Sequence, residues 1–108
     1  MSLEHTCPCS IKCPLQKAME AIGGKWKISI LCSLSSNGAT RYNDLKRKMK
    51  GISNTMLAKS LKELEDNGLV KRTEYMEVPI RVEYEATQAV EELKPIMLEL
   101  AKWGSKIG

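Results

Sequence analysis

The chain has 108 residues, 43% of them hydrophobic and 28% charged, which is the balance of one small globular domain with a single modest core. No apolar stretch approaches the roughly 20 residues of a membrane span and no secretory signal is visible, so we expect a cytoplasmic protein. The formal net charge of +4 is compatible with an anionic partner.

This charge is unevenly spread along the chain. Residues 1–40 have a net charge of +2. Residues 41–72 carry nine Lys and Arg against four Asp and Glu, net +5, and residues 73–108 carry four against seven, net −3. The basic excess in the middle favours contact with DNA phosphates, which attract clustered cations. The acidic last third is better suited to contact a second subunit.

Two helices are expected before residue 36. Cys13-Pro14 is typical of a helix start, because a proline at the first helical position gives up an N–H that has no partner there. Gly23-Gly24 would end this helix, and a second should run from Lys25 to about Ser35. The expected inward residues are Leu15, Ala18, Met19 and Ile22 in the first helix and Trp26, Ile30, Leu31 and Leu34 in the second.

A third helix is expected from Arg41 to Met49, after the turn signal Ser36-Asn37-Gly38. Its spacing places Tyr42 and Leu45 inward. The outward side carries cations that would hold DNA phosphates and so position the protein without reading sequence: Arg41, Lys46, Arg47 and Lys48.

The segment from Gly51 to Val70 carries the strongest local signals for a helix. Ser53 suits the N-cap, because its hydroxyl can accept a hydrogen bond from an otherwise unpaired backbone N–H. Ile52 and Leu57 can form a hydrophobic staple around that cap. Gly68 suits the left-handed position that commonly follows a helix.

The same helix is amphipathic. Leu57, Leu61 and Leu64 share one face, which should be buried. The residues expected to contact DNA in the major groove lie at the helix start or on the opposite face: Ser53, Asn54, Thr55, Lys59 and Lys62. The alternative is an ordinary surface helix whose lysines are only solvated.

Two strands, over residues 69–75 and 81–86, should form a hairpin with its tip at residues 76–80. The second strand alternates between apolar and charged residues, as a half-buried strand does. Arg81, at the base of the tip, could enter the DNA minor groove, where narrow A·T stretches attract arginine. It could equally form a salt bridge with Glu83, Glu85 or a glutamate of the other strand.

A terminal helix is expected over residues 87–107, with Pro95 kinking or restarting it. Its apolar positions cover more surface than one small domain needs, which favours a dimer interface. A two-fold dimer would place two reading helices about one DNA turn apart. The expected interface residues are Leu93, Ile96, Met97, Leu100 and Trp103.

Together these elements predict a mainly α-helical fold with a small β-ribbon, the winged helix-turn-helix. It would occupy residues 13–108 as one DNA-binding domain with its dimerisation elements, after a flexible cysteine-containing tail at residues 1–12. No cofactor is expected.

Several sequence blocks resemble the HxlR-type transcriptional regulators, relatives of the MarR group. The segment Cys13-Pro-Leu-Gln-Lys-Ala-Met-Glu-Ala-Ile-Gly-Gly-Lys-Trp26 resembles the family's opening signature. Gly51-Ile-Ser53, Leu61-Lys-Glu-Leu-Glu65, Gly68-Leu-Val70 and Val78-Pro-Ile-Arg-Val-Glu-Tyr84 resemble its later blocks in order. The resemblance covers roughly residues 13–104 and implies a prokaryotic homodimer that binds operator DNA. After Tyr84 the chain departs from the family's usual Leu-Thr and later Gly, which puts the start of the last helix in question.

The resemblance also implies a role for Cys13, because the matching cysteine senses electrophiles or oxidants in some members of the family. A thiol at a helix N-terminus with Lys12 and Lys17 nearby should have a lowered pKa and a larger thiolate fraction. Cys7 and Cys9 could then act as resolving thiols. The alternative is a packed N-cap cysteine with no part in signalling.

The same cysteines could instead bind a metal ion in a metal-responsive regulator. Cys7, Cys9 and Cys13 offer soft ligands, but C-x-C-x3-C lacks the paired C-x2-C spacing of structural zinc sites, so no metal is expected.

Two further function classes are less favoured. A thiol oxidoreductase using Cys7 and Cys9 would need a βαβ scaffold or a Cys-His pair, and neither is indicated, so no enzymatic activity is expected. A winged helix that binds proteins instead of DNA remains an alternative, against which the +5 charge of residues 41–72 argues.

Overall fold

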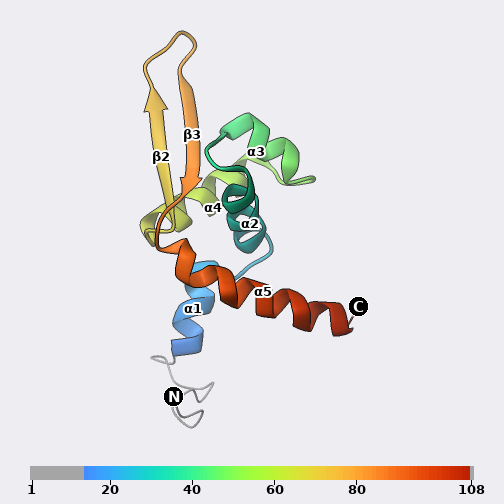
Figure 1. Ribbon diagram of the computed structural model, residues 1–108. Coiled ribbons are helices and arrows are strands. Elements are labelled where there is room, and N and C mark those ends of the chain that lie inside the picture. The colour runs from blue at the N-terminus through green and yellow to red at the C-terminus, as the bar shows by residue number, and fades with distance from the viewer. Residues whose placement is uncertain (1–13, 108) are drawn as a thin grey trace.

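The computed structural model describes residues 14–107. Its helices are α1 (Pro14–Ile22), α2 (Lys27–Asn37), α3 (Tyr42–Lys48), α4 (Asn54–Asp66) and α5 (Val90–Ile107), and its strands are β1 (Thr40–Arg41), β2 (Val70–Tyr75) and β3 (Arg81–Ala86). Figure 1 shows the β2–β3 hairpin standing out from the helices and α5 extending away from them at the other end of the molecule. The winged helix-turn-helix fold expected from the sequence is confirmed. None of the described helices is both long and apolar enough to cross a membrane.

The sheet has one strand more than the sequence predicted. β1 pairs antiparallel with β3, which gives the order β1-β3-β2. In the hairpin, Val70 faces Ala86 and Tyr75 faces Arg81 across the strands. Arg41, predicted as the first residue of the third helix, belongs instead to β1, because Thr40 and Arg41 pair with Tyr84 and Glu83, and α3 starts only at Tyr42.

One hydrophobic core joins α2, α3, α4 and the base of the hairpin with the end of α1 and the start of α5. Eight of its side chains are almost completely buried: Ile30, Leu31, Leu34, Leu45, Leu57, Leu61, Leu64 and Val90. The leucine face of α4 therefore points inward, as its spacing predicted, and the opposite face is left for contacts outside the domain.

The terminal helices differ from the expectation in detail. α5 begins at Val90 instead of residue 87, because Thr87 is held in a turn where its N–H donates to the carbonyl of Leu69 and its hydroxyl donates to that of Gly68. The helix continues through Pro95 to Ile107 without restarting. In α1 only Ile22 is buried, whereas Leu15 and Met19 of the predicted inward stripe are exposed.

Candidate nucleic-acid interface

The start of α4 is built by local interactions. Ser53 has an extended backbone, and its hydroxyl accepts a hydrogen bond from the N–H of Met56 at 3.0 Å. Ile52, just before the cap, is buried with Leu57 in the core, as a hydrophobic staple requires. Gly68 has a φ of +75°, the left-handed conformation that favours glycine after a helix.

The outward face of α4 is polar and open. Asn54, Thr55, Lys59 and Lys62 are all exposed. They are the side chains that the sequence predicted to approach DNA bases and phosphates, and that role stays a prediction. Lys62 pairs with Asp66 at 3.2 Å on the surface, an interaction that a phosphate could replace at small cost.

Tyr42, at the start of α3, contacts both the beginning of α4 and the sheet. Its hydroxyl donates to the carbonyl of Asn54 at 3.2 Å, and its ring lies 6.4 Å from that of Tyr84 on β3. Burial and the neighbouring Tyr84 raise the pKa of Tyr42, so its hydroxyl keeps its proton and remains a donor. The sequence identified Tyr42 only as a core residue.

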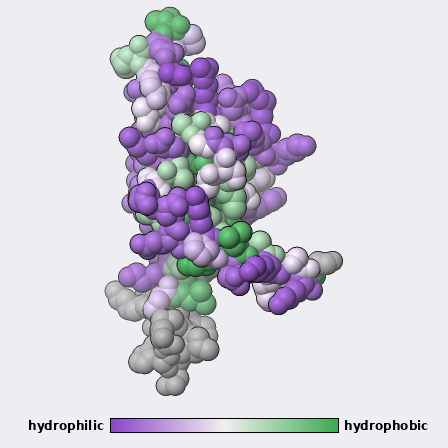
Figure 2. All heavy atoms as spheres, viewed as in Figure 1, coloured by the Kyte–Doolittle hydropathy of each residue, from purple (hydrophilic) through white to green (hydrophobic). Residues whose placement is uncertain are grey.

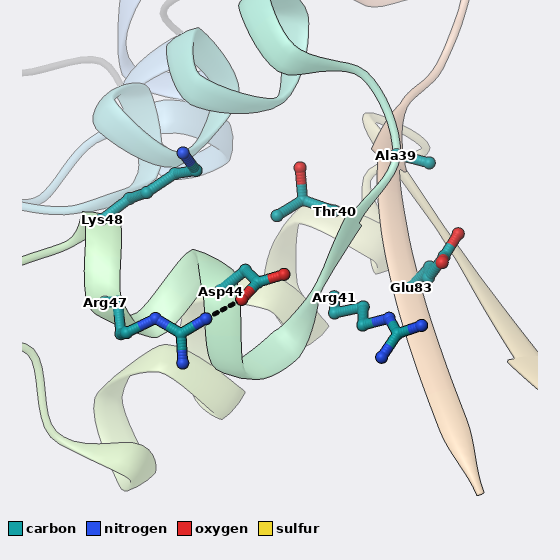
Figure 3. A pocket seen from close by; sticks show the side chains of 7 residues that line it. All are labelled: Ala39, Thr40, Arg41, Asp44, Arg47, Lys48 and Glu83. Atoms are coloured by element: carbon teal, nitrogen blue, oxygen red, sulfur yellow. Dashed lines mark hydrogen bonds and ion pairs between the residues drawn. The ribbon is translucent and has the colours of Figure 1, made fainter.

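Cations from the end of β1 and from α3 border an open concavity of about 490 Å³ between α3, β1 and β3 (Figure 3). Arg41, Arg47 and Lys48 line it together with Asp44 and Glu83. Arg47 is paired with Asp44. This edge therefore carries three positive and two negative side chains, a balance that favours an anion such as a phosphate group.

The predicted phosphate contacts fall into two groups. Some cations are already engaged: Arg47 with Asp44, Lys62 with Asp66, and Arg81 with two glutamates. The others form no ion pair with any residue in the described range: Arg41, Lys46, Lys48 and Lys59. This second group can bind phosphates without first releasing a partner.

Arg81 is built into the hairpin. Its guanidinium lies 2.9 Å from a carboxylate oxygen of Glu77 and 3.2 Å from one of Glu83, and it stacks 4.0 Å from the centre of the Tyr75 ring. The salt bridge to Glu83, one of the two alternatives at the sequence level, is present. The contacts with Tyr75 and Glu77 were not foreseen, because they depend on the shape of the tip.

A second residue that sequence reasoning missed is Lys27. Its side chain is buried, yet its ammonium lies 2.8 Å from a carboxylate oxygen of Glu63 on α4 and donates to the carbonyl of Glu20 on α1 at 3.1 Å. The hydrogen bond from Lys27 lowers the pKa of Glu63. Lys27 thereby connects three helices. The sequence feature that could have indicated this role is a lysine at the start of an otherwise apolar helix.

The predicted dimer-interface residues divide by exposure. Leu93 and Met97 are half-buried and pack against the core of their own domain. Ile96, Leu100 and Trp103 are exposed on α5, as is Ile107. An apolar groove of about 340 Å³ lies beside them, lined by α1 and α5 residues that include Ala18, Ile22, Leu93 and Ile96.

The thiol and metal roles predicted for Cys7, Cys9 and Cys13 concern residues outside the described range. Cys32 is exposed on α2, with its sulfur 3.9 Å from that of Met97. From residue 14 to residue 107, no three His, Cys, Asp or Glu side chains gather in a way that could hold a metal ion.

Comparison with known proteins places this geometry among regulators. Residues 21–108 match the family described as HxlR-like helix-turn-helix. YkvN of Bacillus subtilis, an HTH-type transcriptional regulator, is 47% identical over 92 residues, 85% of this chain and 77% of YkvN.

Solved structures agree with the family match. The structure of the redox regulator HypR in its oxidized form is 37% identical, with a TM-score of 0.79 over 87% of this chain and 96% of HypR. The reduced form of the transcriptional regulator YodB from B. subtilis is 31% identical, with a TM-score of 0.77 over 89% of this chain and 94% of YodB.

Proposed function

Because this chain belongs to the HxlR-like helix-turn-helix family, and is therefore a DNA-binding transcriptional regulator and not an enzyme, we propose that it binds operator DNA as a homodimer in the cytoplasm. Each subunit inserts α4 into the major groove, where Asn54 and Thr55 approach base edges. Lys59 and Lys62 extend this contact along the outer face of the helix, and Ser53 holds the first turn in place.

One observation supports the assignment of the outer face of α4 as the surface that contacts DNA bases. The outer side of α4 is exposed over its whole length while its leucines are buried. The cations that form no ion pair within the described range lie on α4, on the adjacent α3 and at the end of β1. Arg41, Lys46 and Lys48 would hold phosphates beside the groove that α4 enters. Arg47 would join them once Asp44 releases it.

The homodimer is supported by α5. Ile96, Leu100, Trp103 and Ile107 follow one another at helical spacing and are all exposed. An exposed apolar stripe of this length on a small domain is typical of an interface. Helix α5 has no net charge, because its three glutamates are balanced by three lysines, so it lacks the basic excess that residues 41–72 offer to DNA.

We further propose that DNA binding responds to thiol oxidation through Cys13. The support comes from relatives, since HypR is described as a redox regulator and a structure of diamide-treated YodB is known. Cys7 and Cys9 would be the resolving thiols. A metal-responsive use of the same three cysteines is the competing proposal.

One experiment tests both DNA binding and the roles assigned to Lys46 and Thr55. Duplexes that the protein binds are selected from a random library, and affinity for the best one is measured against salt concentration. Lys46→Ala should weaken all duplexes alike and lower the salt slope by about one, whereas Thr55→Ala should change the preferred sequence. Equal weakening of every duplex by both variants would refute the assignment of Thr55, and no preference of the wild type for any duplex would refute operator binding.

The redox proposal is tested on the selected duplex. Diamide should release the wild type and spare Cys13→Ser, with Cys32→Ser as the matched control that still responds. If Cys13→Ser and wild type keep the same affinity after diamide, Cys13 is structural. If the protein leaves the duplex when zinc or a chelator is added, and not when diamide is added, the metal-responsive alternative is supported.

A further inference from the structure

The hydroxyl of Tyr42 faces two oxygens of one residue, Asn54, at the start of α4. It lies 3.2 Å from the backbone carbonyl oxygen of Asn54 and 3.5 Å from the side-chain oxygen Oδ1. The first contact holds the backbone of the helix start, whereas the second acts on a side chain that is proposed to approach a base. Tyr42 can therefore influence which base Asn54 prefers, in addition to how the helix is held.

Packing fixes the place of this hydroxyl. The Tyr42 ring is half-buried against the core, and its plane is inclined at 51° to the ring of Tyr84, which is itself buried. A ring restrained in this way loses little further conformational entropy when its hydroxyl bonds a neighbour. Burial and the neighbouring Tyr84 raise the pKa of Tyr42, so the hydroxyl keeps the proton that it donates.

The side chain of Asn54 has no other restraint of this kind. Asn54 is exposed, and Figure 2 shows a mostly hydrophilic surface over the neighbouring α3. Within residues 14–107, the hydrogen bond from Tyr42 is the only one that the Asn54 amide makes. Without it the amide would rotate between orientations, because water can satisfy its oxygen and its NH2 group equally well. The hydroxyl of Tyr42 thus selects one orientation of the amide.

This orientation decides which group of Asn54 is left for DNA. With Oδ1 turned toward Tyr42, the free group is the NH2, which can only donate hydrogen bonds. An asparagine that reads adenine needs both groups, because it accepts from N6 and donates to N7. Guanine instead presents two adjacent acceptors, N7 and O6, whereas the amino groups of adenine and cytosine would face the amide donor to donor.

We propose that Tyr42 is a specificity-determining residue, which engages Oδ1 of Asn54, directs the amide NH2 group to the major groove and so shifts the preferred base from adenine to guanine. This inference rests on the proposed operator binding. Tyr42 is a positioning residue, since it acts through Asn54 and has no need to touch DNA. Phenylalanine in its place would keep the ring packing and free Oδ1, so the preference depends on a single hydroxyl group.

The first experiment measures the ratio of affinities for guanine and adenine at the base that Asn54 contacts. The wild type must first bind a duplex selected from a random library, so a failure of operator binding is seen separately. The contacted base is the one whose preference disappears in Asn54→Ala. There the wild type should favour guanine, and Tyr42→Phe should shift the ratio about tenfold toward adenine, because the freed Oδ1 can accept from adenine N6. A ratio is used because a general weakening of binding cancels from it.

Tyr84→Phe is the matched control. It removes the hydroxyl of the neighbouring ring and leaves the contact between Tyr42 and Asn54 in place, so the ratio should stay as in the wild type. In an Asn54→Ala background, Tyr42→Phe should not change the ratio, since it acts through Asn54. Three results would overturn the proposal: a wild-type preference for adenine, a ratio that Tyr42→Phe leaves unchanged, or a duplex with no base whose preference depends on Asn54.

A second measurement needs no DNA. The NMR order parameter of the Asn54 side-chain NH2 group should be high in the wild type and should fall in Tyr42→Phe. The side-chain amide of Asn67, which donates to the carbonyl of Glu63 at 2.8 Å, is the internal control and should be unaffected. Equal mobility of the Asn54 amide in both proteins would show that the hydroxyl does not hold it, and would overturn the proposal even if operator binding were confirmed.

Discussion

Replacing Trp103 with alanine tests whether the stripe on α5 is the dimer interface. Its side chain is 60% exposed in the single chain and lies between Leu100 and Ile107 on the same face. A tryptophan side chain presents about 200 Å² of surface. A dimer that covers the exposed part would bury about 120 Å² of it, worth about 3 kcal/mol at 25 cal/mol per Å².

Alanine would retain part of that contact, so the loss is about 2 kcal/mol per subunit. In a two-fold dimer the residue occurs twice, so the interface loses about 4 kcal/mol, and the dimer dissociation constant should rise by about 10³. Sedimentation over a wide range of protein concentration measures this constant directly. On operator DNA, the variant should occupy half-sites independently where the wild type binds both together.

Leu98→Ala is the matched control. Leu98 is as exposed as Trp103 and lies on the same helix, but it points away from the stripe, so its loss should leave the dimer unchanged. If both variants dissociate equally, or if the wild type sediments as a monomer at every concentration, the stripe is not the dimer interface. Met97 is unsuitable for this test, because it packs against the core of its own domain.

Three further outcomes follow from the contacts around α4. Ser53→Ala should lower the free energy of unfolding by about 1 kcal/mol, seen in thermal melting, because the first turn of α4 loses its cap. Tyr42→Phe should cost about 1 kcal/mol and speed amide exchange at the start of α4, since the bond to the Asn54 carbonyl is lost; unchanged exchange would show that the bond does not order the helix. Lys27 holds the pKa of Glu63 below its ordinary 4.5, so this pair stabilises the fold fully above pH 4.5 and loses its effect as the pH falls through the lowered pKa. Glu63→Gln should therefore flatten the decline in urea stability below pH 4.5, and an identical decline in both proteins would contradict this assignment.

Local signals in the sequence were enough to predict α4. Its cap at Ser53, its staple, its leucine spacing and Gly68 all act within the segment itself, through hydrogen bonds and packing between residues a few positions apart. The second hairpin strand was also predictable, because its alternation places Val82, Tyr84 and Ala86 on the face that packs against the core.

Contacts between distant segments were not predictable in the same way. β1 has two residues, too few for a periodic pattern, and it exists because Thr40 and Arg41 pair with β3. Lys27 reads as an ordinary surface lysine until helix packing brings Glu63 and the carbonyl of Glu20 to its ammonium.

The division between the two sources of information is clearest for function. The sequence by itself determined the fold, the family resemblance and the set of cations around α3 and α4, because these depend on local periodicity and composition. Only the tertiary structure decided which side chains remain available: it engaged Arg81 within the hairpin, left Met76 and Val78 exposed at its tip, and turned Trp103 outward from α5. Whether a side chain is free to contact a partner depends on which groups the folded chain brings within a few ångströms of it, and local sequence patterns do not predict those neighbours.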